Sequence, residues 1–276
     1  MSFGKMPSAN GFLDEKDFKN EFFYEMEVGF SEKISLLQLN DFSNPEAVHN
    51  ERYPFYTSSS DYMTRHFKDF AQWLSSKYLS SGSKLVEVGS NDGTFLENFK
   101  DKNINAIGFE PSTTIARLAN KKGIQTFDKF FNTSNLDLIK NFHNKVDIIS
   151  SANVIAHIPD LIDVIKSVDK LLSSKGLLIF EEPYLGSMFA KVSYDQIYDE
   201  HIFMFSISSI SKIFDLFDFE LIDVLPQTTH GGSMRYIIGR KNKHKKSEII
   251  SKFLDEEQSN KLDTIESCLK FKKACE

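Results

Sequence analysis

The chain has 276 residues, of which 41% are hydrophobic and 26% are charged, so it is long enough for one α/β domain with additional segments. Its net charge of −6 argues against a general nucleic-acid-binding protein, because such proteins concentrate Lys and Arg against phosphates. The sequence has no signal-peptide pattern and no run of about 18 uncharged apolar residues, so we expect a cytoplasmic protein without a membrane span. Its two cysteines, Cys268 and Cys275, predict neither a disulfide framework nor a metal site.

The predicted elements begin with an irregular N-terminal lobe, because residues 1–60 follow neither a helical nor a strand period. From Asp61 to Leu79 the apolar residues recur at helical spacing, and Asp61 is expected to cap this helix. Short apolar strands then alternate with helices. The expected strands are 84–88, 106–109, 146–150 and 177–180. One expected helix begins near 94, and two others span 113–121 and 161–172. Such alternation predicts a parallel sheet covered on both faces.

The pattern changes after Pro183. An aromatic and polar insertion at 184–215 leads into a helix near 207–217, and strands at 220–225 and 234–238 are expected to pair as an antiparallel edge hairpin. Residues 247–273 predict one exposed helix. We therefore expect an N-terminal lobe at 1–60, a main domain at 61–245 and a C-terminal helix at 246–276.

A nucleotide-like ligand is predicted at the loop that follows the first main-domain strand. Gly89 and Gly93 place backbone N–H groups where this strand gives way to a helix. A dinucleotide fingerprint requires further glycines at the third and sixth positions, where this chain has Asn91 and Thr94, which weakens an NAD site. Glu110, at the end of the next strand, is placed to accept hydrogen bonds from two ribose hydroxyls.

Glu87 is an acid inside an apolar strand. Burying a carboxylate costs several kcal/mol unless a charged group faces it, and S-adenosylmethionine (SAM) supplies both a sulfonium and an ammonium group. Glu87, Glu110 and the order of the strands together predict SAM as the cofactor. The alternative is a simple turn at Gly89 and Gly93, with Glu110 capping a helix.

Six motifs resemble one known family, the sugar C-methyltransferases that act on nucleotide-linked 4-keto deoxysugars. They occur in the family's order over most of the chain: FGKMPSANGFL, LVEVGSNDGTFL, GFEPS, ANVIAHIPD, YDQIYDEHIFMFS and HGGSMR. The resemblance implies a class I SAM methyltransferase fold: a Rossmann-like, mostly parallel α/β sheet with an antiparallel edge hairpin and a small N-terminal lobe. It also implies a SAM site and a sugar site. Their residues are Glu87, Gly89, Asn91, Gly93, Glu110 and Asn153 for SAM, and Tyr56, His157, Tyr198, Glu200 and His201 for the sugar.

Two departures from the family pattern stand out. Members usually carry a four-cysteine zinc lobe at the N-terminus, whereas this chain has Ser31 and Ile34 where the second cysteine pair falls, so we expect no metal. Members also continue into a further α/β domain after the HGGSxR strand. For this chain we expect either a protein partner that supplies that domain or an enzyme that works without it.

Carbon methylation beside a ketone requires a base and hydrogen-bond donors for the enolate oxygen. We expect His201 to remove the proton, because the pKa of histidine lies near cytosolic pH, with Glu200 orienting it. Tyr198 is the other candidate base. His157, at the predicted carboxyl edge of the sheet, and His230 are expected donors to the oxygen, and Arg235 an expected substrate contact.

Each of these assignments has a structural alternative. His201 and Glu200 can form a structural pair, Tyr194 and Tyr198 a packed helical face, and His157 a hydrogen-bonded core histidine. Two other functions also stay open: O- or N-methylation of another small metabolite, and a non-catalytic subunit with a SAM fold. The intact YDEH and HGGSMR motifs argue against the non-catalytic subunit.

Overall fold

Alternating strands and helices build the central part of the chain. The computed structural model describes residues 1–10, 12–42 and 53–276, which divide into two units. Unit 1 comprises the described parts of Met1–Val48, Ile155–Pro159 and Glu181–Glu276, and unit 2 those of His49–Val154 and Asp160–Phe180. The domain boundaries expected at 60 and 245 stay predictions.

Parallel strands form the sheet of unit 2. They are β4 (Lys84–Val88), β5 (Asn105–Phe109), β6 (Thr126–Phe127), β7 (Val146–Ala152) and the larger part of β8 (Leu172–Pro183). β4 pairs in parallel with both β5 and β7, and β5 pairs in parallel with β6. The whole seven-stranded order is β10-β11-β8-β7-β4-β5-β6, with β10 (Phe219–Gln227) and β11 (Ser233–Arg240) antiparallel. The predicted mostly parallel sheet with an antiparallel hairpin is confirmed.

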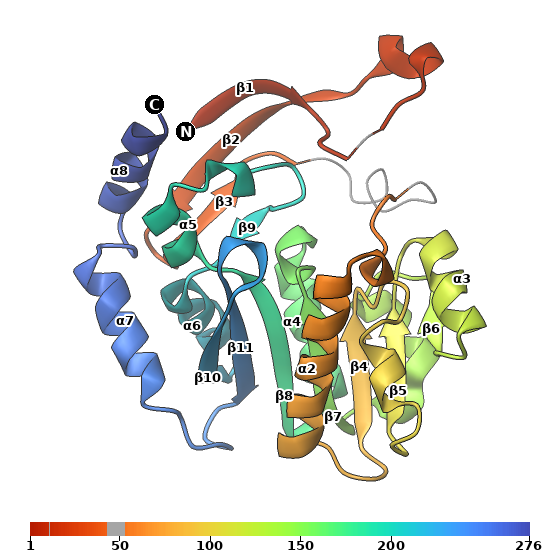
Figure 1. The fold of residues 1–276 in the computed structure, drawn as a ribbon. Helices are drawn as coiled ribbons and strands as arrows, with labels where there is room; N and C mark the ends of the chain where they lie inside the picture. Colours follow the sequence, from red (N-terminus) through yellow and green to blue (C-terminus); the bar gives the residue numbers. More distant parts are fainter. Residues whose placement is uncertain (11, 43–52) are drawn as a thin grey trace. The chain divides into compact units, whose positions relative to one another are not determined.

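The helices of unit 2 lie along its parallel strands (Figure 1). They are α2 (Asp61–Lys77), α3 (Thr113–Lys121) and α4 (Leu161–Leu171). α2 buries Phe67, Phe70 and Leu74 on one face, as its helical spacing predicts. The predicted cap is wrong by one residue, because the Ser60 hydroxyl accepts the Met63 N–H at 3.3 Å while Asp61 lies in the first turn.

The helix expected from Thr94 is wrong. After β4 the chain forms only a short 3-10 helix, η3 (Leu96–Phe99). The Asn98 side-chain amide donates to the carbonyls of Thr94 and Phe95, both at 3.0 Å. These bonds fasten the Asn98 side chain to the start of this turn.

The irregular lobe expected at 1–60 is also wrong where the structure describes it. β1 (Ser2–Pro7), β2 (Phe23–Ser31), β3 (Leu36–Leu39) and β9 (Phe203–Met204) form a four-stranded antiparallel sheet in unit 1. Tyr24, Met26 and Val28 alternate with exposed residues and point into the core of the unit. The strand period is therefore present over 23–28, and, among the described strands of this sheet, the one distant in sequence is β9, which pairs with β3.

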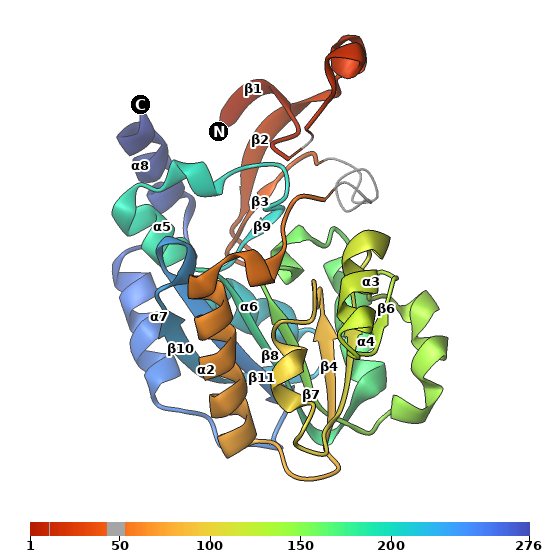
Figure 2. The same cartoon turned by 45° about the vertical axis from the view of Figure 1, so that its right-hand side comes forward.

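The described part of unit 1 also contains four helices of at least seven residues, α5 (Leu185–Lys191), α6 (Ile207–Asp215), α7 (Ile249–Ser259) and α8 (Ile265–Cys275). The single exposed helix expected over 247–273 is thus wrong, because the chain turns at Lys261 (φ +55°) and buries Leu262 in the core. β1 and α8, which carry the two ends of the chain, lie side by side in Figures 1 and 2. The short 3-10 helices are η1 (Glu15–Asn20), η2 (Thr57–Ser59), η4 (Thr133–Phe142), η5 (Ile155–His157), η6 (Tyr194–Gln196) and η7 (Thr229–Gly231). Within the described ranges, no helix has the length and apolarity to cross a membrane.

Candidate functional site

The loop from Gly89 to Gly93 lies at the carboxyl end of β4, between the ends of β5 and β7. Ligands of open α/β sheets bind at such a reversal of strand order. Gly89 (φ +68°) and Gly93 (φ +80°) adopt left-handed backbone, and so does Asn91 (φ +48°). A Cβ atom on Gly89 would lie 2.3 Å from Val154 Cγ2, so this position admits glycine alone. The glycine thereby lets the loop after β4 pack against the segment that follows Asn153.

Glu87 is an uncompensated acid on β4, with a side chain only 4% exposed. Its Oε2 atom has no hydrogen-bond partner in the part of the chain that the structure describes. Burial, followed by the charges of Glu110 and Asp92, raises the pKa of Glu87 well above its usual range. A carboxyl group that is buried and has an unpartnered oxygen is stabilised in its ionised form by a cationic ligand.

Glu110 follows β5 and is also buried. Its Oε2 accepts the Asn91 N–H at 3.1 Å, and its Oε1 accepts the Ser112 N–H at 2.8 Å. Burial raises the pKa of Glu110 to about 7, against the opposing effect of these two N–H groups. Each carboxylate oxygen has two lone pairs, so both retain room to accept a ligand hydroxyl.

Asn153 follows β7 in left-handed backbone (φ +57°). Its Oδ1 atom is buried, and so are the hydroxyls of Ser90 and Ser150; within the described residues none of the three has a hydrogen-bond partner. Buried polar atoms are nearly always paired, so orphaned ones at the carboxyl ends of β4 and β7 indicate a bound polar molecule. Together with Glu87 and Glu110, they fit a ligand that carries a cation and hydroxyl groups.

Asn91 has a second task that the sequence did not predict. Its Nδ2 donates to the Phe55 carbonyl at 3.0 Å, and its Oδ1 accepts the Thr57 N–H at 2.9 Å. The Asn91 side chain therefore fastens the segment around Tyr56 to the loop after β4. Tyr56 lies in unit 2 with this loop, whereas the other residues expected at the sugar site lie in unit 1.

In unit 1 the structure brings together four of the residues predicted to be catalytic. The rings of Tyr198 and His201 have centroids 4.4 Å apart, and those of His157 and His201 are 5.2 Å apart. His157 Nδ1 lies 3.5 Å from Glu200 Oε2. A buried cluster of two imidazoles, a phenol and a carboxylate results.

His201 is held as a neutral imidazole. Its Nδ1 lies 2.7 Å from the Gln196 carbonyl oxygen, which can only accept, so the geometry assigns the proton to Nδ1 and the lone pair to Nε2. Burial lowers the pKa of His201 to about 4, with a smaller contribution from His230. Burial, followed by the charges of Glu200 and Asp199, raises the pKa of Tyr198, which stays a protonated phenol. The pair thus offers one proton acceptor and one donor.

Arg235 and His230 also belong to unit 1. The Arg235 guanidinium is buried on β11 and pairs with Glu181, at 2.5 Å from Nη2 and 2.6 Å from Nε to Oε1. His230 lies in the turn before β11 in left-handed backbone (φ +48°), and the Gly232 carbonyl in that turn accepts the Tyr184 N–H at 3.0 Å. The predicted substrate contact Arg235 therefore shares its charge with Glu181.

The segment directly after β1 contacts the YDEH motif, which the sequence pattern did not predict. Ser8 Oγ donates to Asp199 Oδ2 at 2.5 Å, and the Ala9 N–H donates to Asp199 Oδ1 at 3.1 Å. The Asn10 side-chain amide donates to Glu200 Oε1. No periodicity signals these contacts, because the partners are about 190 residues apart; their sole trace is the FGKMPSANGFL motif.

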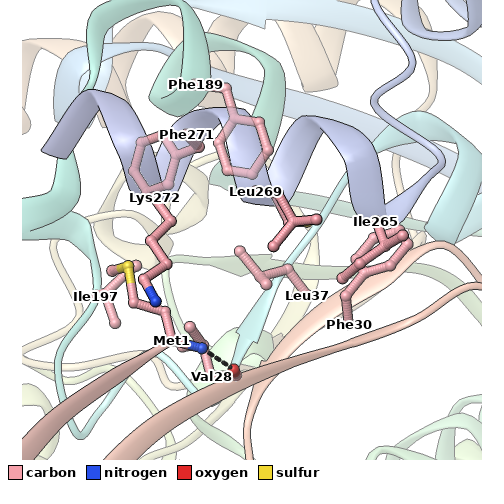
Figure 3. A pocket seen from close by; sticks show the side chains of 11 residues that line it. Met1, Val28, Phe30, Leu37, Phe189, Ile197, Ile265, Leu269, Phe271 and Lys272 are labelled. Carbon is pink, nitrogen blue, oxygen red and sulfur yellow. Dashed lines mark hydrogen bonds between the residues drawn. The ribbon is translucent and has the colours of Figure 1, made fainter. Parts of the chain in front are cut away.

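An apolar pocket of about 70 Å³ lies elsewhere in unit 1 (Figure 3). Phe30, Leu37, Phe189, Ile197 and Leu269 are among its lining residues, and the Met1 ammonium at its edge donates to the Val28 carbonyl at 2.9 Å. Ile197 directly precedes Tyr198. The pocket therefore belongs to the apolar packing behind the polar cluster and offers no proton-transfer chemistry of its own.

Comparison with known proteins adds to this geometry. Residues 60–224 match a family model described as methyltransferase domain, and residues 228–276 match one described as C-methyltransferase C-terminal domain. C-methyltransferase NovU of Streptomyces niveus is 28% identical over 236 residues, which cover 85% of this chain and 56% of NovU. The chain therefore spans little more than half the length of this relative.

Solved structures share the fold at low sequence identity. A Pyrococcus horikoshii protein superposes with a TM-score of 0.54 at 14% identity, covering 68% of this chain and 96% of that protein. A SAM-dependent methyltransferase from Thermotoga maritima has a TM-score of 0.50 at 20% identity, covering 66% and 92%. At such identities the likeness establishes the fold.

Proposed function

This chain belongs to the methyltransferase domain family with SAM as methyl donor, and we propose that it methylates a carbon beside the ketone of a nucleotide-linked keto-deoxysugar. One arrangement carries this function. A neutral, buried His201 lies against the protonated phenol of Tyr198 and beside the Glu200–His157 pair. Enolate chemistry needs such a proton acceptor among hydrogen-bond donors.

The donor site is proposed in unit 2. Glu87 faces the positive charge of the donor, the Glu110 carboxylate accepts ribose hydroxyls, and Asn153 offers its unpaired Oδ1 atom. Gly89 and Gly93 hold the loop in left-handed backbone, packed against Val154 and Ile124. When bound, SAM supplies an electrophilic methyl group on a sulfonium.

The acceptor chemistry is proposed for unit 1. His201 Nε2 removes the proton from the carbon beside the ketone, since its Nδ1 is committed to the Gln196 carbonyl. A pKa of about 4 makes His201 a weak base, so proton removal depends on donors that stabilise the developing oxyanion. Tyr198 donates as a phenol, and His157 donates from Nε2 in its doubly protonated form, with Nδ1–H directed at the Glu200 carboxylate that orients the ring. His230, Arg235 and Tyr56 are proposed as further substrate contacts.

The test is incubation of the protein with SAM and a panel of dTDP-, CDP- and GDP-linked 4-keto sugars, followed by mass spectrometry. At least one sugar is expected to gain one methyl group. The same panel with the ketone reduced to a hydroxyl is the control, because a hydroxyl does not acidify the neighbouring carbon. Methylation of the reduced sugars instead of the keto sugars would indicate an O-methyltransferase.

The affinity for S-adenosylhomocysteine (SAH), the demethylated product, is expected to fall as the pH is lowered from 8 to 6. Below a pKa of about 7 the Glu110 carboxyl is protonated and loses acceptor positions for the ribose hydroxyls. Because the ionised form is present above this pKa and is lost below it, the affinity should drop about tenfold between pH 8 and pH 6. Isothermal titration calorimetry measures this dependence.

Glu110→Gln is the matched control for this titration. The variant should bind SAH more weakly at pH 8 and should lose most of the pH dependence, because the amide does not titrate. An unchanged slope in Glu110→Gln would assign the titration to another group.

A further inference from the structure

Three consecutive residues after β1 donate hydrogen bonds to two consecutive acids of the YDEH motif. Ser8 and Ala9 both bind Asp199, through a hydroxyl at 2.5 Å and a main-chain N–H at 3.1 Å. Asn10 binds Glu200 through its side-chain amide. All five residues belong to unit 1.

These contacts meet a physical need of the motif. Asp199 is 3% exposed and Glu200 is 4% exposed, and a buried carboxylate is costly unless hydrogen bonds replace its water shell. Asn10 is a neutral donor, so it satisfies Glu200 Oε1 without cancelling the charge that Oε2 presents to His157 at 3.5 Å. A lysine in its place would form an ion pair and remove that charge from His157.

The segment is held firmly enough to position other groups. Met6 and Pro7 of β1 pair with Tyr24 and Phe23 of β2 immediately before Ser8. Tyr24 packs in the same apolar cluster as Ile197, which directly precedes the YDEH motif. The donors and the acids are thus both fixed to one shared core.

We propose that Ser8, Ala9 and Asn10 form a clamp in which Asn10 is a positioning residue that sets the Glu200 carboxylate against His157. Ser8 and Ala9 fix the neighbouring Asp199 and so the path of the main chain through the motif. The kinetic consequence rests on the proposed function, because it requires His157 to act on the substrate oxygen. The structural consequence, a change at His157 when Asn10 is altered, does not.

The first test needs no substrate. The ring ¹⁵N resonances of His157, identified by their loss in His157→Gln, are expected to shift in Asn10→Ala, since Glu200 loses the donor that orients it. Asn40→Ala is the matched control: the Asn40 amide donates to Glu27 at 3.1 Å in the same sheet, exposed and outside the motif. Identical His157 resonances in the wild type and Asn10→Ala would overturn the clamp.

The second test is kinetic and uses the sugar that the panel identifies. Asn10→Ala should lower kcat by about 10- to 100-fold, as small displacements of catalytic groups do, with the KM for SAM unchanged. Asn10→Asp keeps the shape but replaces the donor with a second carboxylate, so it should lower kcat at least as much. A role in packing alone predicts the reverse order, with Asn10→Asp milder than Asn10→Ala, and that order would refute the proposal.

Two outcomes separate the clamp from the proposed function. If the wild type methylates none of the sugars, the proposed function fails, and the His157 resonances still decide whether Asn10 positions Glu200. If the wild type is active and Asn10→Ala matches Asn40→Ala in kcat, the clamp fails while the proposed function stands. Wild-type amide resonances of β2 and β3 in both Asn10 variants verify that unit 1 folds, and retained SAH binding verifies that unit 2 does.

Discussion

His201→Ala is expected to slow solvent deuterium exchange at the carbon beside the ketone by about 100- to 10,000-fold, the usual contribution of a positioned general base. Exchange is measured by NMR with SAH bound in place of SAM, so that proton removal is followed without methyl transfer. The physical reason is that Nε2 of His201 holds the lone pair in this cluster, while burial keeps the Tyr198 phenol protonated. Methyl transfer should fall with exchange.

Two controls make this result specific to His201. His66→Ala, on α2 of unit 2, should exchange like the wild type, and His201→Ala should bind SAH with wild-type affinity because the donor residues lie in unit 2. Exchange that persists at the wild-type rate in His201→Ala would assign proton removal to another residue. If exchange is lost in Tyr198→Phe but not in His201→Ala, the Tyr198 phenol is the base.

The second large effect is expected at the donor loop. Gly89→Ala should reduce SAH affinity by about 100-fold or more, the scale that a displacement of about 1 Å produces at a positioned site. Left-handed backbone (φ +68°) costs a residue with a Cβ roughly 1–2 kcal/mol, and this Cβ would also meet Val154 Cγ2 at 2.3 Å. The loop or the segment after Asn153 must therefore move, and both border the proposed donor site.

Gly82→Ala separates the effect of left-handed backbone from the effect of a steric clash. Gly82 is also left-handed (φ +86°), but a Cβ there meets nothing within 4 Å. Gly82→Ala should lower the melting temperature and leave the SAH affinity unchanged. Gly89→Ala should lower both the melting temperature and the SAH affinity. Wild-type SAH affinity in Gly89→Ala would remove the loop after β4 from the donor site.

The parts of the fold that depend on local patterns could be predicted from the sequence. The strand Lys84–Val88 and the helix Thr113–Lys121 have the predicted bounds, and the hairpin of β10 and β11 is present. In each case the apolar period and the turn residues lie within a few positions of one another. The bounds of these elements therefore follow from local sequence, although β4 is buried in part by β7, about 60 residues later.

The errors arise where a distant partner or a single side chain decides the structure. β3 pairs with β9, more than 160 residues later, and this pairing completes a sheet that the N-terminal period alone does not specify. Burial of Leu262 in the core of unit 1 interrupts the C-terminal helix. Sequence periodicity registers none of these contacts.

The candidate site divides in the same way. Glu87, Gly89 and Glu110 could be placed from the order of strands, because each lies on or directly after a predicted strand. The tautomer of His201 depends on the Gln196 carbonyl, and the setting of Glu200 depends on Asn10; neither can be derived without coordinates. Residues that position catalytic groups leave a weaker trace in the sequence than the groups themselves.

One measurement bears most directly on carbon methylation. The product of a reaction with [methyl-¹³C]SAM is examined by ¹³C NMR, which distinguishes a methyl bound to carbon from one bound to oxygen or nitrogen. We predict a carbon-bound methyl on the position next to the ketone of at least one nucleotide-linked sugar. A methyl found on oxygen or nitrogen, or no labelled sugar from the whole panel, would contradict the account.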